Sequence, residues 1–102
     1  MVYHEEYIRI LNNVFEIERK IKEGDVSIRR NLERIKSAFE EIGVKYHNPL
    51  GESYTETRTD CEAGISSELS GKLKIINVVK PVIYVRHEEG YRIVQKAVVV
   101  VG

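Results

Sequence analysis

The chain has 102 residues, 42% hydrophobic and 31% charged, which is enough for one domain or for two small modules sharing a core. Its 16 acidic and 16 basic residues cancel, which argues against nucleic acid or an anionic membrane surface as a partner. No apolar run reaches the length of about eighteen residues that a membrane span needs.

The location of the protein is expected to be the cytoplasm. The start of the chain, Met-Val-Tyr-His-Glu-Glu, is mixed and acidic, which is unlike a secretory leader. The single cysteine, Cys61, has no second cysteine with which to form an intramolecular disulfide. A reducing compartment is the simplest setting for such a chain.

A first helix is predicted from residue 3 to about residue 22. Steps of four and three residues, the 3.5-residue repeat of a coiled coil, separate Tyr3, Tyr7, Ile10, Val14, Ile17 and Ile21. Two adjoining apolar rows are typical of a helix with more than one packing neighbour. The second row contains Ile8, Leu11 and Phe15.

A second amphipathic helix is predicted after the break at residues 22–25, with Asp25 or Ser27 as its cap. Its apolar stripe contains Ile28, Leu32, Ile35, Phe39 and Ile42. Gly43 follows the last residue of this stripe, the position at which helices commonly end in a left-handed conformation. A short connection makes the two helices antiparallel neighbours, and two such hairpins would close a four-helix bundle. The pattern therefore predicts a homodimer.

The remainder of the chain is predicted to form strands. Residues 51–60 read as an extended loop, and strands are expected over 61–68, over 73–86 with a bend at Pro81, and over 91–101. Turns are expected at 69–72 and at 87–90, where a late glycine suits a bulged hairpin. Residues 97–101 are apolar on both faces, which favours a central strand. The fold class is therefore α+β, with a helical dimerisation region (1–45) and a small all-β domain (46–102).

No catalytic, metal or cofactor site is apparent in the sequence. The three histidines are far apart and show no ligand spacing with Cys61. Asp60 and Glu62 flank Cys61 and would raise the pKa of its thiol rather than activate it. No glycine-rich phosphate loop occurs. We predict a binding protein rather than an enzyme; the remaining enzymatic alternative is a small enzyme with Cys61 as its nucleophile.

Five segments, in the same order, resemble the GrpE family, the nucleotide exchange factors of DnaK-type heat-shock chaperones. The similarity runs from roughly residue 10 to the end of the chain. The segments are Phe39-Glu40-Glu41-Ile42-Gly43-Val44-Lys45-Tyr46, like the family's second short helix and Gly-Val turn; Asn48-Pro49-Leu50-Gly51-Glu52-Ser53-Tyr54, like Pro-x-Gly-Glu-x-Phe; Cys61-Glu62-Ala63, like His-Glu-Ala; Ile76-Asn77-Val78-Val79-Lys80-Pro81, like Val-x-x-Val-x-x-Gly-Tyr; and residues 90–100, like the closing Gly-Arg-Val-Ile-Arg-Pro-Ala-x-Val-x-Val strand.

The sequence also departs from the family pattern. The loop after Tyr54 is about two residues longer, Cys61 replaces a histidine, and Lys96 replaces a proline. Pro81-Val82 stands where the family has Gly-Tyr, and the long N-terminal coiled coil is absent or cut short. These differences indicate a divergent or shortened relative.

The resemblance implies a co-chaperone without cofactor or metal. In the family, two chains dimerise through helices, and a β module binds the chaperone's nucleotide-binding domain in an opened state that releases ADP. The family's chaperone contacts fall on Arg92, Tyr54, Glu56 and Ser27. Arg92 could equally be a solvated strand arginine, and Ser27 a helix cap. The alternative function is a GrpE-like dimeric scaffold or interaction module without exchange activity.

Overall fold

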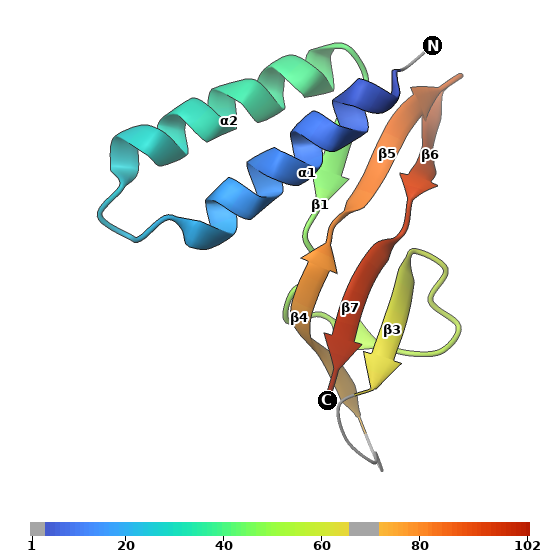
Figure 1. The fold of residues 1–102 in the computed structure, drawn as a ribbon. Coiled ribbons are helices and arrows are strands. Elements are labelled where there is room, and N and C mark those ends of the chain that lie inside the picture. The colour runs from blue at the N-terminus through green and yellow to red at the C-terminus, as the bar shows by residue number, and fades with distance from the viewer. Residues whose placement is uncertain (1–3, 66–71) are drawn as a thin grey trace. The chain divides into compact units, whose positions relative to one another are not determined.

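The computed structural model describes residues 4–65 and 72–102, and it shows an α+β fold in which two helices precede a β-rich region (Figure 1). The elements are α1 (Glu5–Lys20), α2 (Val26–Glu41), β1 (Val44–His47), β2 (Ser53–Tyr54), β3 (Cys61–Ile65), β4 (Leu73–Lys80), β5 (Val82–His87), β6 (Gly90–Gln95) and β7 (Ala97–Val101). Among the described residues these strands form two sheets, with the orders β1-β5-β6 and β2-β4-β7-β3.

The contacts within the chain divide it into two compact units. The first unit contains the helices up to Lys45 together with Tyr84–Arg92, and the second contains Tyr46–Ile83 and Ile93–Gly102. The boundary after residue 45 coincides with that of the predicted domains. Residues 84–92 differ, because they group with the helices and the start of β1 and not with the rest of the predicted β domain.

The predicted helical hairpin is confirmed, with α1 and α2 running in opposite directions in the first unit (Figure 1). The rings of Tyr7 and Phe39 meet edge to face with their centroids 5.6 Å apart. Glutamates in the first turn of α1 and basic residues in its last turn complement the helix dipole. The fully or nearly buried helical side chains are Leu11, Val14, Phe15 and Leu32.

The end of α2 has the left-handed glycine cap that the sequence predicts. Gly43 has a φ of 91°, and its amide donates to the carbonyl oxygen of Glu40 over 3.0 Å. A second cap comes from β5, because the guanidinium of Arg86 donates to the same Glu40 carbonyl over 3.1 Å. The amide of Arg86 also donates to the carbonyl of Gly43 over 2.8 Å. The Glu40 carbonyl, one of the last four of the helix, therefore accepts a hydrogen bond from another element as well.

Three predictions about the strands are corrected by the structure. Residues 44–47, which lie before the first strand predicted from the sequence, form β1. The predicted last strand is two strands, β6 and β7, separated at Lys96 and belonging to different sheets. In the β5–β6 turn the residue with positive φ is Glu88, at 55°, and not the late Gly90. The end of the predicted strand at 61–68, beyond Ile65, and residues 69–71 of the predicted turn lie outside the described residues.

Two bulges in β4 determine which of its apolar side chains are buried. β4 is antiparallel to β7, and its register shifts between Ile75 and Asn77 and again between Val78 and Lys80. Each shift adds one residue to β4, and an added residue breaks the two-residue alternation of a strand. Ile75 and Val78 are buried as a result, whereas Ile76 and Val79 are 53% and 46% exposed.

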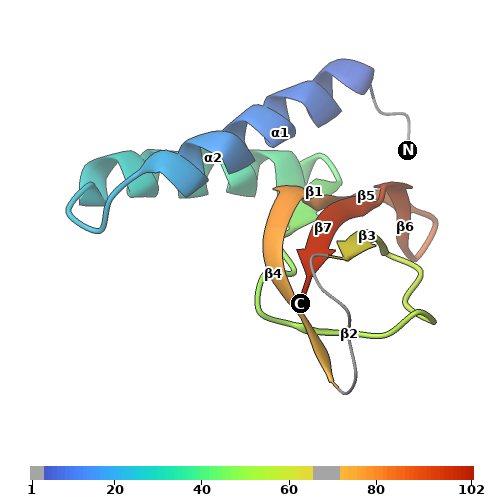
Figure 2. The same cartoon turned by 60° about the horizontal axis from the view of Figure 1, so that its bottom comes forward.

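β7 is the central strand of the four-stranded sheet, as its two-sided apolar sequence predicts. It pairs in parallel with β3 and antiparallel with β4, and Figure 2 shows it between these two strands. Its alternate residues Ala97, Val99 and Val101 are at most 1% exposed. Neither of the two helices in the described part of the chain is long and apolar enough to cross a membrane.

Candidate functional site

The structure places the four sequence-predicted site residues in both units. Tyr54 is half-buried in β2, and Glu56 is exposed in the turn that follows; both belong to the second unit. Arg92 is exposed in β6 of the first unit. Ser27 is also exposed in the first unit, as the second residue of α2.

The sequence offers Asp25 or Ser27 as the cap of α2, and the structure distinguishes between these two positions. Asp25, and not Ser27, occupies the N-cap position. Its carboxylate accepts a hydrogen bond from the amide of Lys22 over 2.9 Å, which closes the turn between the helices. The interpretation of Ser27 as a helix cap is therefore wrong.

Arg92 lies on the face of β6 opposite to an aromatic contact. The ammonium of Lys45 is 4.0 Å from the centroid of the Tyr91 ring, an attractive cation–π geometry. Because successive strand residues leave a strand on opposite faces, Arg92 and Tyr91 belong to different faces of β6, and Arg92 is exposed.

The candidate site in the second unit is the segment from His47 to Asp60, which links β1 to β3. Its first turn is set by Asn48, whose side-chain oxygen accepts from the amide of Leu50 over 3.1 Å, and by Gly51, whose φ is 85°. The segment then runs beside β4. Gly51 donates to the carbonyl of Ile75, and Ile75 donates to the carbonyl of Glu52, each over 2.9 Å.

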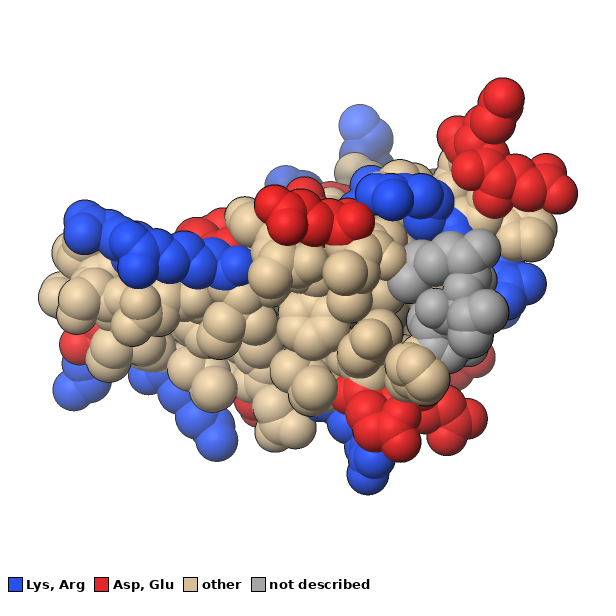
Figure 3. Space-filling view, turned by 90° about the horizontal axis from the view of Figure 1, so that it is seen from above, with Lys and Arg blue, Asp and Glu red and all other residues tan. Residues whose placement is uncertain are grey.

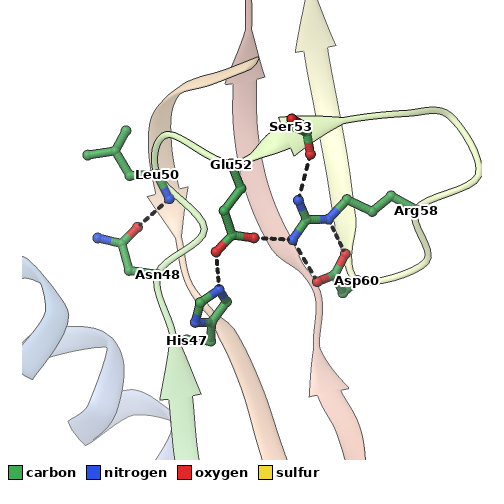
Figure 4. Close-up of polar contacts among 7 residues, drawn as sticks. All are labelled: His47, Asn48, Leu50, Glu52, Ser53, Arg58 and Asp60. Atoms are coloured by element: carbon green, nitrogen blue, oxygen red, sulfur yellow. Dashed lines mark hydrogen bonds and ion pairs between the residues drawn. The ribbon is translucent and has the colours of Figure 1, made fainter. Parts of the chain in front are cut away.

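Arg58 gathers the polar groups of this segment around its guanidinium (Figure 4). Its Nε is 2.7 Å from Oδ1 of Asp60 and its Nη2 is 3.1 Å from Oδ2, a two-pronged pair. Nη2 also donates to Oε1 of Glu52 over 2.6 Å, and Nη1 donates to the carbonyl of Ser53 over 2.9 Å. The other carboxylate oxygen of Glu52 pairs with Nε2 of His47. We call His47, Glu52, Arg58 and Asp60 the Arg58 network.

The Arg58 network is partly shielded from water, which strengthens its interactions. The side chains of Arg58 and Asp60 are only 19% and 18% exposed. The hydrogen bond from Arg58 lowers the pKa of Asp60. Burial by itself would raise the pKa of Glu52, but hydrogen bonds from Arg58 and His47 outweigh burial and lower it. Both carboxylates therefore stay ionised near neutral pH.

Cys61 begins β3 directly after the network, and it is 6% exposed. Burial raises the pKa of its thiol to about 11; the charge of Arg58 opposes this and that of Asp60 adds to it. The predicted strand does begin at Cys61, and the pKa of the thiol is raised in the predicted direction, although burial and not the flanking carboxylates is the largest cause. A thiol with such a pKa is a poor nucleophile at neutral pH.

No motif in the sequence predicts the Arg58 network, although one feature of the sequence points to Arg58. Arg58 is the only basic residue between Gly51 and Cys61, and it stands among threonines and acidic residues. Chemically, the Arg58 network is a set of ion pairs that holds the backbone of this segment in place. Within residues 4–65 and 72–102 no three or more His, Cys, Asp and Glu side chains gather in a way that could hold a metal ion.

In the second unit the Arg58 network thus holds the inner positions of the segment by charge, whereas Glu56 is exposed and Tyr54 is half-buried. Comparison of the chain with protein-family models, with curated proteins and with solved structures finds no match.

Proposed function

We propose that the protein is a GrpE-type nucleotide exchange factor, a co-chaperone in protein folding and the stress response. It would bind the nucleotide-binding domain of a DnaK-type chaperone in the cytoplasm and promote ADP release. The observation that carries the proposal is the order of elements. A helical hairpin ends at the Gly43 cap, continues directly into a buried Val44, and precedes a β-rich region whose last strand is central.

The homodimer is proposed from apolar side chains that a single chain leaves exposed. We call these side chains the isoleucine row: Ile10 and Ile17 on α1, and Ile28, Ile35 and Ile42 on or just after α2. Each is between 40% and 45% exposed. Neighbouring members on the same helix are seven residues apart. The first unit covers the Leu11 and Phe15 row instead.

A second copy is the occupant that this spacing suits. A seven-residue apolar repeat presents the same face on every second turn, which a partner helix with the same repeat covers by interlocking side chains. Figure 3 shows a broad uncharged area on one face of the molecule, with charged side chains of both signs at its margins. Pairing two hairpins through this row would complete the four-helix bundle.

The proposed mechanism requires binding energy and no catalytic group. A factor that binds the open chaperone more tightly than the closed one must weaken nucleotide binding by the same factor. A 100-fold loss of ADP affinity corresponds to about 2.7 kcal/mol of differential binding. One buried arginine contact and one aromatic contact are of this size at interfaces. Arg92 and Tyr54 are proposed as these contacts, and Glu56 and Ser27 as contacts at the rim.

The test is the release rate of a fluorescent ADP analogue from the nucleotide-binding domain of a DnaK-type chaperone, titrated with the protein. We expect the rate to rise with concentration and to saturate. Arg92→Ala should shift the titration midpoint about tenfold or more, as the loss of an arginine hot spot does. Arg30→Gln, an exposed arginine change on α2, serves as the matched control.

The outcome also decides between the two GrpE-like functions. An unchanged release rate, together with a dimer in solution, would contradict exchange activity and favour the scaffold alternative. The observations in favour of that alternative are the lengthened loop after Tyr54 and Lys96 between β6 and β7. An Arg92→Ala variant as active as the parent would contradict the site assignment alone.

A further inference from the structure

The loop between β2 and β3 is held at both ends by backbone hydrogen bonds. In its middle the hydroxyls of Thr55 and Thr57 are 2.9 Å apart, and Arg58 makes the side-chain contacts that reach beyond the loop's own turn. At one end Glu52 is bonded to β4, and at the other the carbonyl of Asp60 accepts from the amide of Ala97 in β7 over 2.9 Å. Between these anchors, Thr55, Glu56, Thr57 and Thr59 are exposed. Arg58 is the residue of this stretch that turns inward, as Figure 4 shows.

Arg58 joins the two anchored ends to each other. Three nitrogens of its guanidinium reach Asp60 at the start of β3 and both Glu52 and the Ser53 carbonyl at the start of β2. Its amide also donates to the carbonyl of Thr55 over 3.0 Å, which closes the turn that carries Glu56. A planar guanidinium can satisfy acceptors in three directions at once, whereas a lysine ammonium on a flexible stem cannot fix them in one plane.

The two carboxylates beside Arg58 require a positive charge between them. The carboxylates of Glu52 and Asp60 converge on one cation, and they would repel each other without it. His47 contacts only the far oxygen of Glu52, so it does not replace Arg58 between the two carboxylates. Among the described side chains, Arg58 is the cation that bridges the two carboxylates.

We propose that Arg58 is a positioning residue that holds residues 53–59 in the conformation in which Tyr54 and Glu56 contact the chaperone. This inference rests on the proposed function. It explains how a loop longer than the resembled pattern keeps a defined shape, since each ordered loop residue otherwise costs binding free energy when it is immobilised.

The experiment compares the parent with Arg58→Gln and Arg58→Lys, with Arg30→Gln as the control for loss of a surface arginine. Amide hydrogen exchange of residues 53–60 reports loop order without any chaperone. The titration midpoint and the saturating rate of ADP-analogue release report binding and the effect of the bound factor separately. The carboxyl NMR titration of Glu52 reports the loss of its cation.

For Arg58→Gln we expect faster exchange at residues 53–60, a rise in the Glu52 pKa, and a midpoint about tenfold higher. The saturating release rate should be unchanged, because the loop contacts still form at high concentration. Arg58→Lys should keep part of the lowering of the Glu52 pKa. Its titration midpoint should nevertheless stay close to that of Arg58→Gln. If Arg58→Gln unfolds the second unit, Arg58→Lys and Asp60→Asn supply the same comparison.

Two results would overturn the inference. Parent-like amide exchange in Arg58→Gln would show that the loop is ordered without the clamp. A parent-like midpoint despite faster exchange would show that loop order does not matter for binding. A parent that never accelerates release contradicts the proposed function itself and removes the binding role of Arg58 with it, whereas an active parent with an equally active variant contradicts Arg58 alone.

Discussion

Val78 and Val79 are consecutive residues of β4, yet the first is 3% exposed and the second 46%. This difference in burial can be tested by replacing each of the two valines with alanine. Val78→Ala removes two buried methyl groups and should lower the free energy of unfolding by about 2 kcal/mol. Val79→Ala should change it by less than about 0.5 kcal/mol. Urea denaturation of the two variants measures both values, and equal losses would contradict the bulged register of β4.

The cap that Arg86 places on α2 predicts a modest loss of stability. Arg86→Gln removes the hydrogen bond to the Glu40 carbonyl and should cost about 0.5–1.5 kcal/mol. Denaturant unfolding followed by the helix signal in circular dichroism measures it. Arg30→Gln is the control, and an equal effect of both variants would show that the contact contributes nothing.

The isoleucine row predicts that one charge disrupts the proposed dimer. Ile35→Glu places a carboxylate in the centre of the row on α2, where burial of an unpaired charge is costly, and should shift the protein from dimer to monomer at micromolar concentration. Ser37→Glu is the matched control, because Ser37 is exposed and two helical residues away, which places it on the opposite side of α2. Sedimentation equilibrium distinguishes these outcomes. A monomeric parent, or a dimeric Ile35→Glu, would contradict the four-helix bundle.

The Arg58 network predicts a loss of stability in acid. The pKa values of Glu52 and Asp60 are lowered from 4.5 and 3.8, so the unfolded chain binds more protons than the folded chain as the pH falls through these values. Their stabilisation is complete above the ordinary pKa values and is lost as the pH falls below them. Asp60→Asn should be about 1–3 kcal/mol less stable at pH 7 and should lose less on acidification. A parallel pH profile for parent and variant would contradict this.

The buried thiol of Cys61 predicts a loss of stability at high pH. Its pKa is raised from 9.0 to about 11, so above pH 9 the unfolded chain loses a proton that the folded chain keeps. The free energy of unfolding should therefore fall by up to about 1.4 kcal/mol per pH unit between these values. Cys61→Ala should remove this alkaline loss. Alkylation of Cys61 in the folded protein should be slow at pH 7, and rapid labelling would revive the thiol-enzyme alternative.

The elements set by local periodicity could be predicted from the sequence. Both helices follow from apolar steps of three and four, the Gly43 cap from a glycine after the last apolar residue, and the central place of β7 from its two-sided apolar run. In each case the signal lies in neighbouring residues and reflects one physical cause, the burial of a face. These predictions needed no knowledge of distant parts of the chain.

The features that were missed depend on pairing between distant residues. The run from Ile75 to Val79 allows several registers, and only its partner β7 decides that Ile76 and Val79 face outward. The turn at 87–90 was predicted from its late glycine, but a glutamate is not an expected residue at positive φ, so the conformation of Glu88 was not predicted. The Arg58 network requires the loop to fold back so that Glu52 and Asp60 approach one another, and loop closure of this kind is not encoded in a periodic pattern.

The place of β7 in the middle of its sheet has a consequence for synthesis on the ribosome. β3 and β4 pair with β7 and not with each other, so neither can complete its hydrogen bonds until residue 101 has left the exit tunnel. The helical hairpin, whose contacts are local, can form much earlier. The nascent chain would therefore carry a folded helical segment and unpaired strands for part of its synthesis, a state in which exposed strand edges invite aggregation.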